Sequence, residues 1–193
     1  MSRRFIGLAA VALVAACGGG NPVGNPPDIL NPPGALGQKL SFAYFQACIN
    51  PIFEKQLQNG TAVNRCASGG CHDNVTGTGG ALRLVQTPAM VDVLDPANTP
   101  DVIRTTDMYK NFYTAQGAVV IGAPTQSRLF AKPLVLNVLH GGGQIFPDAN
   151  DPNAKLIAYW ITHPAPKDQD EFSTATYSLF TPPVPDPANC TPP

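Results

Sequence analysis

Two cysteines and a histidine in a short polar stretch are the residues of this sequence best suited to chemistry. Cys66 and Cys71 are separated by four residues, and His72 follows the second cysteine directly. Two thiols in this order can add across the two vinyl groups of a haem, and an imidazole beside the second thiol can then reach the iron. The usual spacer has two residues. Because Gly69 and Gly70 can adopt backbone conformations closed to other residues, we expect the two extra residues to loop out.

Three other uses of these side chains are a zinc site, an iron–sulfur site and a disulfide. Structural zinc sites usually space their ligands as C-x2–4-C and H-x3–5-H, whereas Cys71 and His72 are neighbours and the sequence has no second pair of that kind. A plant-type iron–sulfur site begins C-x4-C but then needs a C-x2-C pair, which does not follow Cys71. A disulfide between Cys66 and Cys71 is the simplest structural alternative. The motif favours covalent haem attachment over all three.

Five segments around this motif resemble the bacterial c-type cytochrome lipoproteins that carry a CxxxxCH haem-attachment motif, which are class I-like cytochromes c. The resemblance implies a mainly α, cytochrome c-like helical domain around one covalently bound haem c. It also implies that Cys66 and Cys71 carry the thioether bonds and that His72 is the proximal iron ligand. The segments are FQACINPIF at 45–53, GGALRL at 79–84, SRLF at 127–130, HGGG at 140–143 and AYWI at 158–161.

The second axial position on the iron needs a ligand from elsewhere in the chain. Class I cytochromes c usually take a methionine from the segment before the final helix, but here that segment holds His140, three glycines and no methionine. We therefore expect His140 to lie opposite His72, with the glycines letting the backbone come close to a porphyrin. Met108, Met90 and an open or water-bound site are the alternatives. His163 follows the last predicted helix and is expected at the surface.

The motif and the resemblance together predict a membrane-anchored monohaem cytochrome that carries single electrons in the bacterial cell envelope and exchanges them with redox partner proteins. A carrier is favoured over a catalyst, so no catalytic residue is assigned. One alternative is a peroxidase-type haem enzyme with an open distal site, which would need an acid–base group nearby. Another is a haem-bearing subunit of a larger membrane complex.

The first residues have the composition of an export signal. Arg3 and Arg4 precede an apolar run over residues 5–14, which is shorter than the ~20 residues that a membrane-spanning helix needs. Small residues then lead to Cys17, which resembles the lipobox cysteine of bacterial lipoproteins. We therefore expect residues 1–16 to be a lipoprotein signal peptide that is removed, and Cys17 to be the lipid-modified N-terminus of the mature protein.

Residues 17–37 are rich in Gly, Pro and Asn, which is typical of a flexible tether between a lipid and a folded domain. Gly18 resembles the residue that follows the lipidated cysteine in lipoproteins of the outer membrane, which favours that membrane, on its periplasmic side. Without residues 1–16 the chain holds 10 basic and 13 acidic residues and no basic run. Nucleic-acid binding needs clustered Lys and Arg, so this class of partner is excluded.

Cys48 and Cys190 are the two cysteines that neither the lipid nor the haem motif would use. An oxidising cell envelope permits disulfides and disfavours free thiols. A bond between the two would close a very long loop and hold the Pro-rich C-terminal segment against the first helix, with a loop-closure stabilisation of about 4–5 kcal/mol. We therefore predict a disulfide between Cys48 and Cys190.

Helical patterns dominate the central region, so the fold class is mainly α, with a loop-rich haem domain over residues 38–166. An amphipathic helix is expected over residues 40–57, where Pro51 marks a kink or a second start. We expect Phe45 and Trp160 to meet where the first and last helices pack. No strand pattern is evident. The other expected elements are a loop at 64–80, helices at 88–94, 127–139 and 153–162, and a Pro-rich tail at 167–193.

Overall fold

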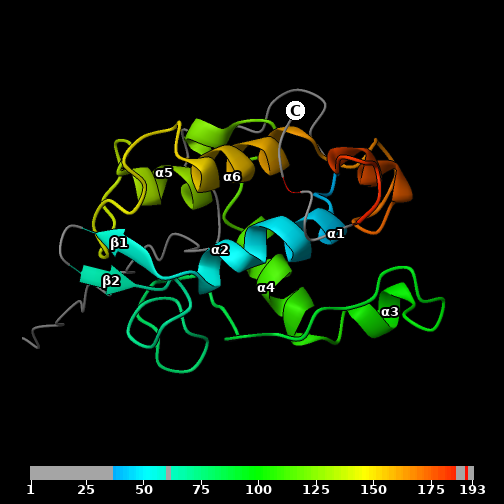
Figure 1. The fold of residues 1–193 in the computed structure, drawn as a ribbon, viewed down its shortest axis with the longest axis horizontal. Helices are drawn as coiled ribbons and strands as arrows, with labels where there is room; N and C mark the ends of the chain where they lie inside the picture. Colours follow the sequence, from blue (N-terminus) through cyan, green and yellow to red (C-terminus); the bar gives the residue numbers. More distant parts are fainter. Residues whose placement is uncertain (1–36, 60–61, 186–189, 191–193) are drawn as a thin grey trace, which may run out of the picture.

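The computed structural model describes residues 37–59, 62–185 and 190 of the 193-residue chain. This part is mainly α-helical, as the sequence predicts, with long loops and one small hairpin at the edge (Figure 1). None of its helices is both long and apolar enough to cross a membrane. In chain order the elements are α1 (Phe42–Tyr44), the π-helix η1 (Phe45–Ile49), α2 (Asn50–Glu54), β1 (Leu57–Asn59), β2 (Ala62–Asn64), α3 (Pro100–Ile103), α4 (Asp107–Gln116), the 3₁₀-helix η2 (Pro124–Gln126), α5 (Arg128–Leu134), α6 (Pro152–Thr162) and the 3₁₀-helix η3 (Thr174–Leu179).

The first helical segment runs through α1, η1 and α2 without a break, over residues 42–54. Ser41 begins it, because its Oγ accepts a hydrogen bond from the backbone N–H of Tyr44. Pro51 lies in the first turn of α2, directly after η1, and its missing N–H leaves one position of the continuous segment without a helical hydrogen bond. The helix predicted over residues 40–57 is therefore confirmed with shorter bounds, and Pro51 marks an internal restart.

The hairpin of β1 and β2 follows directly and is antiparallel, with Leu57 opposite Asn64. The sequence predicts no strand here, because strands of three residues are too short to show an alternating pattern. From residue 65 onward the chain is irregular as far as α3, which confirms the loop predicted over residues 64–80.

The helix predicted over residues 88–94 is wrong. This stretch is irregular, and Thr87 has a positive φ of 46°. The buried side chain of Gln46 explains the difference, because its amide donates to the carbonyl of Val91 at 2.8 Å and accepts from the N–H of Val91 at 3.1 Å. These bonds use backbone groups that a helix would need. A tertiary contact therefore overrides the local preference of Thr87 and Pro88 for starting a helix.

Helices α3 and α4 lie beyond the predicted helix, and each begins at a threonine. The Oγ1 of Thr99 accepts from the N–H of Val102, and the Oγ1 of Thr106 accepts from the N–H of Tyr109. Such caps satisfy N–H groups that have no partner within the helix. The sequence analysis misses both helices. Helix α3 has only four residues, too few to show a period, whereas Met108, Phe112 and Ala115 of α4 have the spacing of a helix and could have identified it.

Helix α5 begins after Ser127 as predicted but ends at Leu134, short of the predicted end at residue 139. The hydroxyl of Ser127 does not cap the helix, because it bonds instead to the backbone of Val120 and Ala123. Val135 then takes a left-handed conformation with a φ of 55°, which stops the helix. The following residues are therefore a loop.

Helix α6 confirms the helix predicted over residues 153–162. The carboxylate of Asp151 accepts hydrogen bonds from the N–H groups of Asn153 at 2.8 Å and Ala154 at 3.3 Å, and Pro152 occupies the first turn. This is the arrangement that an Asp-Pro pair at a helix start favours.

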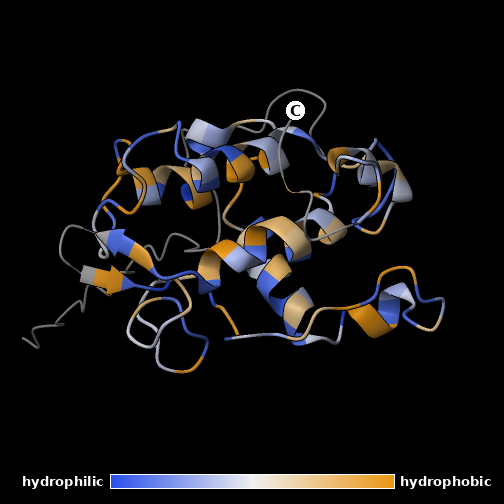
Figure 2. Cartoon of the chain, viewed as in Figure 1, coloured by the Kyte–Doolittle hydropathy of each residue, from blue (hydrophilic) through white to orange (hydrophobic). Residues whose placement is uncertain are grey.

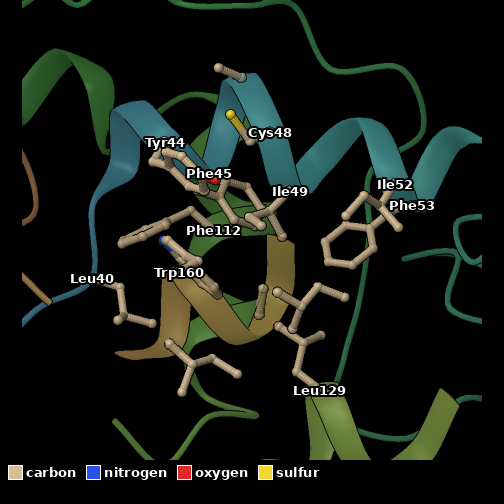
Figure 3. Packing of buried hydrophobic residues seen from close by; sticks show 14 of the residues in the cluster. Leu40, Tyr44, Phe45, Cys48, Ile49, Ile52, Phe53, Phe112, Leu129 and Trp160 are labelled. Carbon is tan, nitrogen blue, oxygen red and sulfur yellow. The ribbon is translucent and has the colours of Figure 1, made fainter. Parts of the chain in front are cut away.

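The core lies where the first helical segment packs on α4 and α6. The ring centroid of Phe45 lies 5.5 Å from those of both Phe112 and Trp160, which confirms the predicted contact of Phe45 with Trp160, and Figure 3 shows the three side chains gathered between the helices. The fully buried indole of Trp160 donates to the carbonyl of Ser41 at 3.0 Å. Figure 2 shows apolar and polar residues alternating around these helices, as expected of helices with one buried face.

Described residues of the segment predicted as a Pro-rich tail, 167–193, pack on the same core. The segment forms η3, and Leu179 and Phe180 are only 6% and 1% exposed. A disulfide joins Cys190 to Cys48, the pairing that the sequence predicts. Despite the Pro-rich composition of the segment, Leu179 and Phe180 pack in the core, and the disulfide joins Cys190 to the first helical segment.

Glu171 fastens this segment to α3 and α4. Its buried carboxylate accepts hydrogen bonds from Oη of Tyr109 at 2.7 Å and from Nε of Arg104 at 3.2 Å, and its backbone carbonyl accepts from the N–H of Phe42 at 2.9 Å. Burial alone would raise the pKa of Glu171. The hydrogen bonds from its own N–H, Tyr109 and Arg104 outweigh burial and hold the pKa below its ordinary value of 4.5.

Replacing Glu171 by Gln should make the free energy of unfolding less dependent on pH in acid. The contribution of the carboxylate is fully present above the unfolded pKa near 4.5 and is lost as the pH falls through the lower folded pKa. In denaturant titrations we expect Glu171→Gln to be less stable than wild type by about 1–3 kcal/mol at pH 7, and the gap to narrow below pH 4.5. Asp101→Asn, which removes an exposed partner of Arg104, is the control. If the difference in the free energy of unfolding between Glu171→Gln and wild type does not change with pH, the Glu171 carboxylate does not stabilise the fold in this way.

Candidate functional site

A cavity of about 630 Å³ lies among α2, the C-terminal end of α4, α5 and α6. Its volume falls within the range of about 300–1,000 Å³ that is usual for cofactor and small-molecule sites. Three of the predicted site residues line it, namely Cys66, His72 and His140. Apolar side chains form much of the remaining wall, including Ile52, Phe53, Leu82, Leu129, Phe146 and Ile157.

His72 is half-buried and held by the segments on both sides of it. Its backbone N–H donates to the carbonyl of Cys66 at 3.0 Å, and its carbonyl accepts from the N–H of Leu84 at 2.8 Å. Its Nδ1 lies 3.1 Å from the carbonyl oxygen of Leu82, to which it donates when that nitrogen carries the proton. Burial lowers the pKa of His72 below its ordinary value of 6.5, so the ring is neutral at pH 7, the form that binds metal ions.

His140 lies on the loop after α5, with its ring centroid 6.2 Å from that of His72 and the two ring planes 17° from parallel. Its Nδ1 lies 2.7 Å from the carbonyl oxygen of Gly143. In both rings Nδ1 is therefore engaged by backbone, and Nε2 is left to take a ligand. Two imidazoles that bind one metal ion from opposite sides have centroids about 6 Å apart, because each bond is about 2 Å long and each nitrogen lies about 1 Å from its centroid. The observed separation fits this arrangement.

Cys66 and Cys71 are both half-buried and carry free thiols in this structure. Burial, with a smaller contribution from Cys71, raises the pKa of Cys66 to about 11, so this thiol is protonated at pH 7. Gly70 in the spacer has a φ of 82°, a conformation that favours glycine, as expected of a residue that loops out. Cys66 lines the cavity, whereas Cys71 is not among its lining residues.

Asp73 organises the loop after the motif, and the sequence analysis does not identify it. Its Oδ1 accepts from the N–H groups of Val75 at 2.9 Å and Thr76 at 2.7 Å, and its Oδ2 accepts from Nε2 of Gln86 at 3.0 Å. The bonds from Thr76 and Gln86 are the main reasons that the pKa of Asp73 is lowered to about 2. An Asp before short polar residues is a typical turn signal and could have identified this residue.

Gly79 lies against the ring of His72. A Cβ at this position would lie 2.4 Å from Nδ1 of His72 and 2.8 Å from the carbonyl oxygen of Cys71, so no side chain fits. Its N–H also donates to that carbonyl at 2.7 Å. Gly142 is packed less tightly, since a Cβ there would lie 3.2 Å from Cε1 of His140.

The alternative iron ligands lie away from the cavity. Met108 is 2% exposed and packs in the core, and Met90 is 54% exposed. His163 is exposed, with its ring centroid 4.0 Å from that of Tyr159. None of these three side chains lines the cavity. Among the predicted distal ligands, only His140 lies beside His72 in the described part of the chain.

Other parts of the predicted machinery lie outside the described residues, namely the signal peptide at 1–16, the lipidated Cys17 and the tether up to residue 36. Within residues 37–59, 62–185 and 190, no group of three or more His, Cys, Asp or Glu side chains is placed to hold a metal ion.

No family model, curated protein or solved structure matches this chain. What the site can do is therefore inferred from its own residues, which are two imidazoles, two thiols and an apolar cavity wall.

Replacing Gly79 by Ala should displace the ring of His72, because the added Cβ would overlap its Nδ1. We expect a loss of about 1–3 kcal/mol in the free energy of unfolding and a shift of the His72 ring resonances in NMR spectra. Gly141→Ala is the matched control, since a Cβ there meets nothing within 4 Å. Equal effects of the two substitutions would show that Gly79 does not support His72.

Proposed function

We propose that this protein is a monohaem c-type cytochrome that carries single electrons. One observation carries the proposal: His72 and His140, which are far apart in the sequence, line one cavity with nearly parallel rings whose centroids lie 6.2 Å apart. Cys66 lines the same cavity, and Cys71 is the residue before His72. Opposed imidazoles beside paired thiols are the side chains that covalent haem binding needs.

Each of these residues has one task in the proposal. Cys66 and Cys71 would hold the haem through thioether bonds, and His72 and His140 would occupy the two axial positions on its iron. When bound, the haem supplies one-electron chemistry between ferric and ferrous iron. Two imidazoles would add to the four nitrogens of a porphyrin to give the iron six ligands, whereas a structural zinc site needs four ligands from the protein. This difference is the reason that the pair favours haem over zinc.

The backbone determines how each imidazole is presented. The carbonyls of Leu82 and Gly143 accept from Nδ1 of His72 and His140, which selects one tautomer, orients the ring and makes Nε2 a stronger ligand. The apolar cavity wall keeps water away from the space between the rings. A second imidazole in place of a methionine favours a lower reduction potential, because methionine raises it.

A carrier is favoured over a peroxidase-type enzyme because of the position of His140. Peroxidase chemistry needs an open position at the metal and an acid–base group next to it. In the proposed site His140 would occupy that position, because its ring centroid lies 6.2 Å from that of His72. Electron transfer requires no substrate at the metal, so a closed site is suited to it.

Membrane attachment through Cys17 is part of the same proposal and is supported by the sequence alone. The tether predicted over residues 17–37 would join the lipid to the haem domain that begins at residue 38, at the outer membrane on its periplasmic side. One acyl chain binds membranes weakly, whereas two or more anchor a protein stably. Recovery of the wild-type protein from the soluble fraction with an unmodified Cys17 would contradict this attachment.

Protein made in a host with a cytochrome c maturation system should carry one covalent haem. Denaturing gels should retain a haem stain, and the mass should exceed that of the chain by one haem. Cys66→Ser and Cys71→Ser should each leave at most one thioether bond. Cys48→Ser/Cys190→Ser is the control, because these cysteines form the distant disulfide, and it should keep its covalent haem. A colourless wild-type protein would refute the proposal.

Replacing His140 by Ala should open one axial position. We expect the visible spectrum of the oxidised protein to change from low-spin to high-spin and cyanide to bind readily, whereas wild type resists it. His163→Ala is the matched control, because His163 is exposed and does not line the cavity, and its spectrum should equal that of wild type. If Met108→Leu and not His140→Ala produces the high-spin spectrum, the ligand assignment is wrong. A wild-type protein that is already high-spin would favour the enzyme.

A further inference from the structure

Three basic residues, Lys39, Arg128 and Lys132, line the cavity between His72 and His140. Arg128 and Lys132 are four residues apart on α5, so their side chains lie on one face of that helix. Lys39 and Arg128 are exposed and Lys132 is half-buried, so the positive charges lie where the cavity meets solvent.

The backbone of Lys39 is held from two sides. Its carbonyl accepts a hydrogen bond from the N–H of Ala165 at 2.7 Å, and the N–H of Leu40 donates to Oε1 of Gln116 at 3.0 Å. Gln116 is itself a lining residue at the end of α4, and Ala165 follows α6. The backbone of Lys39 is therefore fixed at the cavity before any ligand binds, so binding would order only its side chain.

The residues that line the cavity in the described part of the chain include no Asp or Glu. Composition does not explain this, because the sequence holds 13 acidic and 12 basic residues. Glu54 adjoins a lining residue, but its carboxylate lies 3.6 Å from Arg65. Within the described residues, neither the Lys39 nor the Lys132 ammonium group has an ion-pair partner. Like charges around an apolar space repel one another, and an anionic ligand would remove that repulsion.

On the basis of the proposed haem site, we propose that Lys39, Arg128 and Lys132 form a carboxylate-binding subsite for the two propionate groups of the haem. A porphyrin is apolar over its faces and anionic at one edge, and this cavity is apolar within and basic at its mouth. Charge-assisted hydrogen bonds to carboxylates are among the stronger polar contacts that a protein can offer. The basic residues would hold the propionate groups where the cavity meets solvent, while Cys66 and Cys71 would hold the haem through its vinyl groups.

The subsite can be tested with two ligands that differ only in their carboxylates. The full mature chain, prepared without haem and with reduced thiols, is titrated with haem and with haem dimethyl ester, in which both carboxylates are blocked. We expect wild type to bind haem about 10-fold or more tightly than the ester. Lys39→Gln/Lys132→Gln should lose most of this preference. Lys155→Gln/Lys167→Gln is the matched control, because these exposed lysines do not line the cavity, and it should keep the preference.

The outcomes separate the two proposals. If wild type binds both ligands equally, or if the two double variants behave alike, the subsite is refuted and the haem site stands. If wild type binds neither ligand, the haem site is refuted and the subsite with it. Circular dichroism spectra identical to that of wild type establish that a lost preference does not come from misfolding.

Discussion

The hydrogen bond from the indole of Trp160 to the carbonyl of Ser41 sets the arrangement on which the rest of the structure depends. A buried indole N–H without an acceptor would destabilise the fold, and the acceptor here is the residue that begins the first helical segment. The hydroxyl of Ser41 also bonds to Oγ1 of Thr176 in η3, at 2.8 Å. One residue thus joins the first segment, α6 and the C-terminal segment. Phe53 and Ile157, which belong to the first two of these elements, both line the cavity.

The histidines themselves lie on loops, so their positions depend on backbone hydrogen bonds rather than on helix packing. A carboxylate, Asp73, holds the turn after His72, and the ring of His72 is confined between Gly79 and the carbonyl of Leu82. His140 bonds within its own turn, to Gly143, and the chain after it is secured by the N–H groups of Ile145 and Phe146, which both donate to the carbonyl of Pro133. Loops placed by a rigid core are a common location for binding residues.

The sequence predicts best where local chemistry decides the outcome. The helix predicted over residues 153–162 is confirmed, because the Asp151 cap and Pro152 both act within the first turn of α6. The helix expected at 88–94 fails because Gln46, far away in the sequence, takes up the backbone groups of Val91. The packing of Leu179 and Phe180 from the predicted Pro-rich tail into the core is not predicted, since two apolar residues are hard to recognise among prolines.

The candidate site divides in the same way. The spacing of Cys66, Cys71 and His72 is visible in the sequence, and the preference for His140 came from its place before the last helix. The basic residues of the cavity could not be predicted, because Lys39 and α5 meet there only through tertiary structure. The carbonyls of Leu82 and Gly143 could not be predicted as acceptors either, because every residue has a backbone carbonyl and the residue type does not show which one bonds to a histidine.

The disulfide between Cys48 and Cys190 would require an order of events during maturation. In the proposed export to an oxidising cell envelope, Cys48 would meet Cys66 and Cys71 before Cys190 arrives, and shorter loops close more readily. The native pairing would then depend on the two nearer thiols being occupied or shielded while the chain is still incomplete. Thioether formation would occupy them permanently. A chain without thioether bonds could form a disulfide from Cys48 to Cys66 or Cys71 instead of to Cys190. Haem attachment would therefore also favour correct folding.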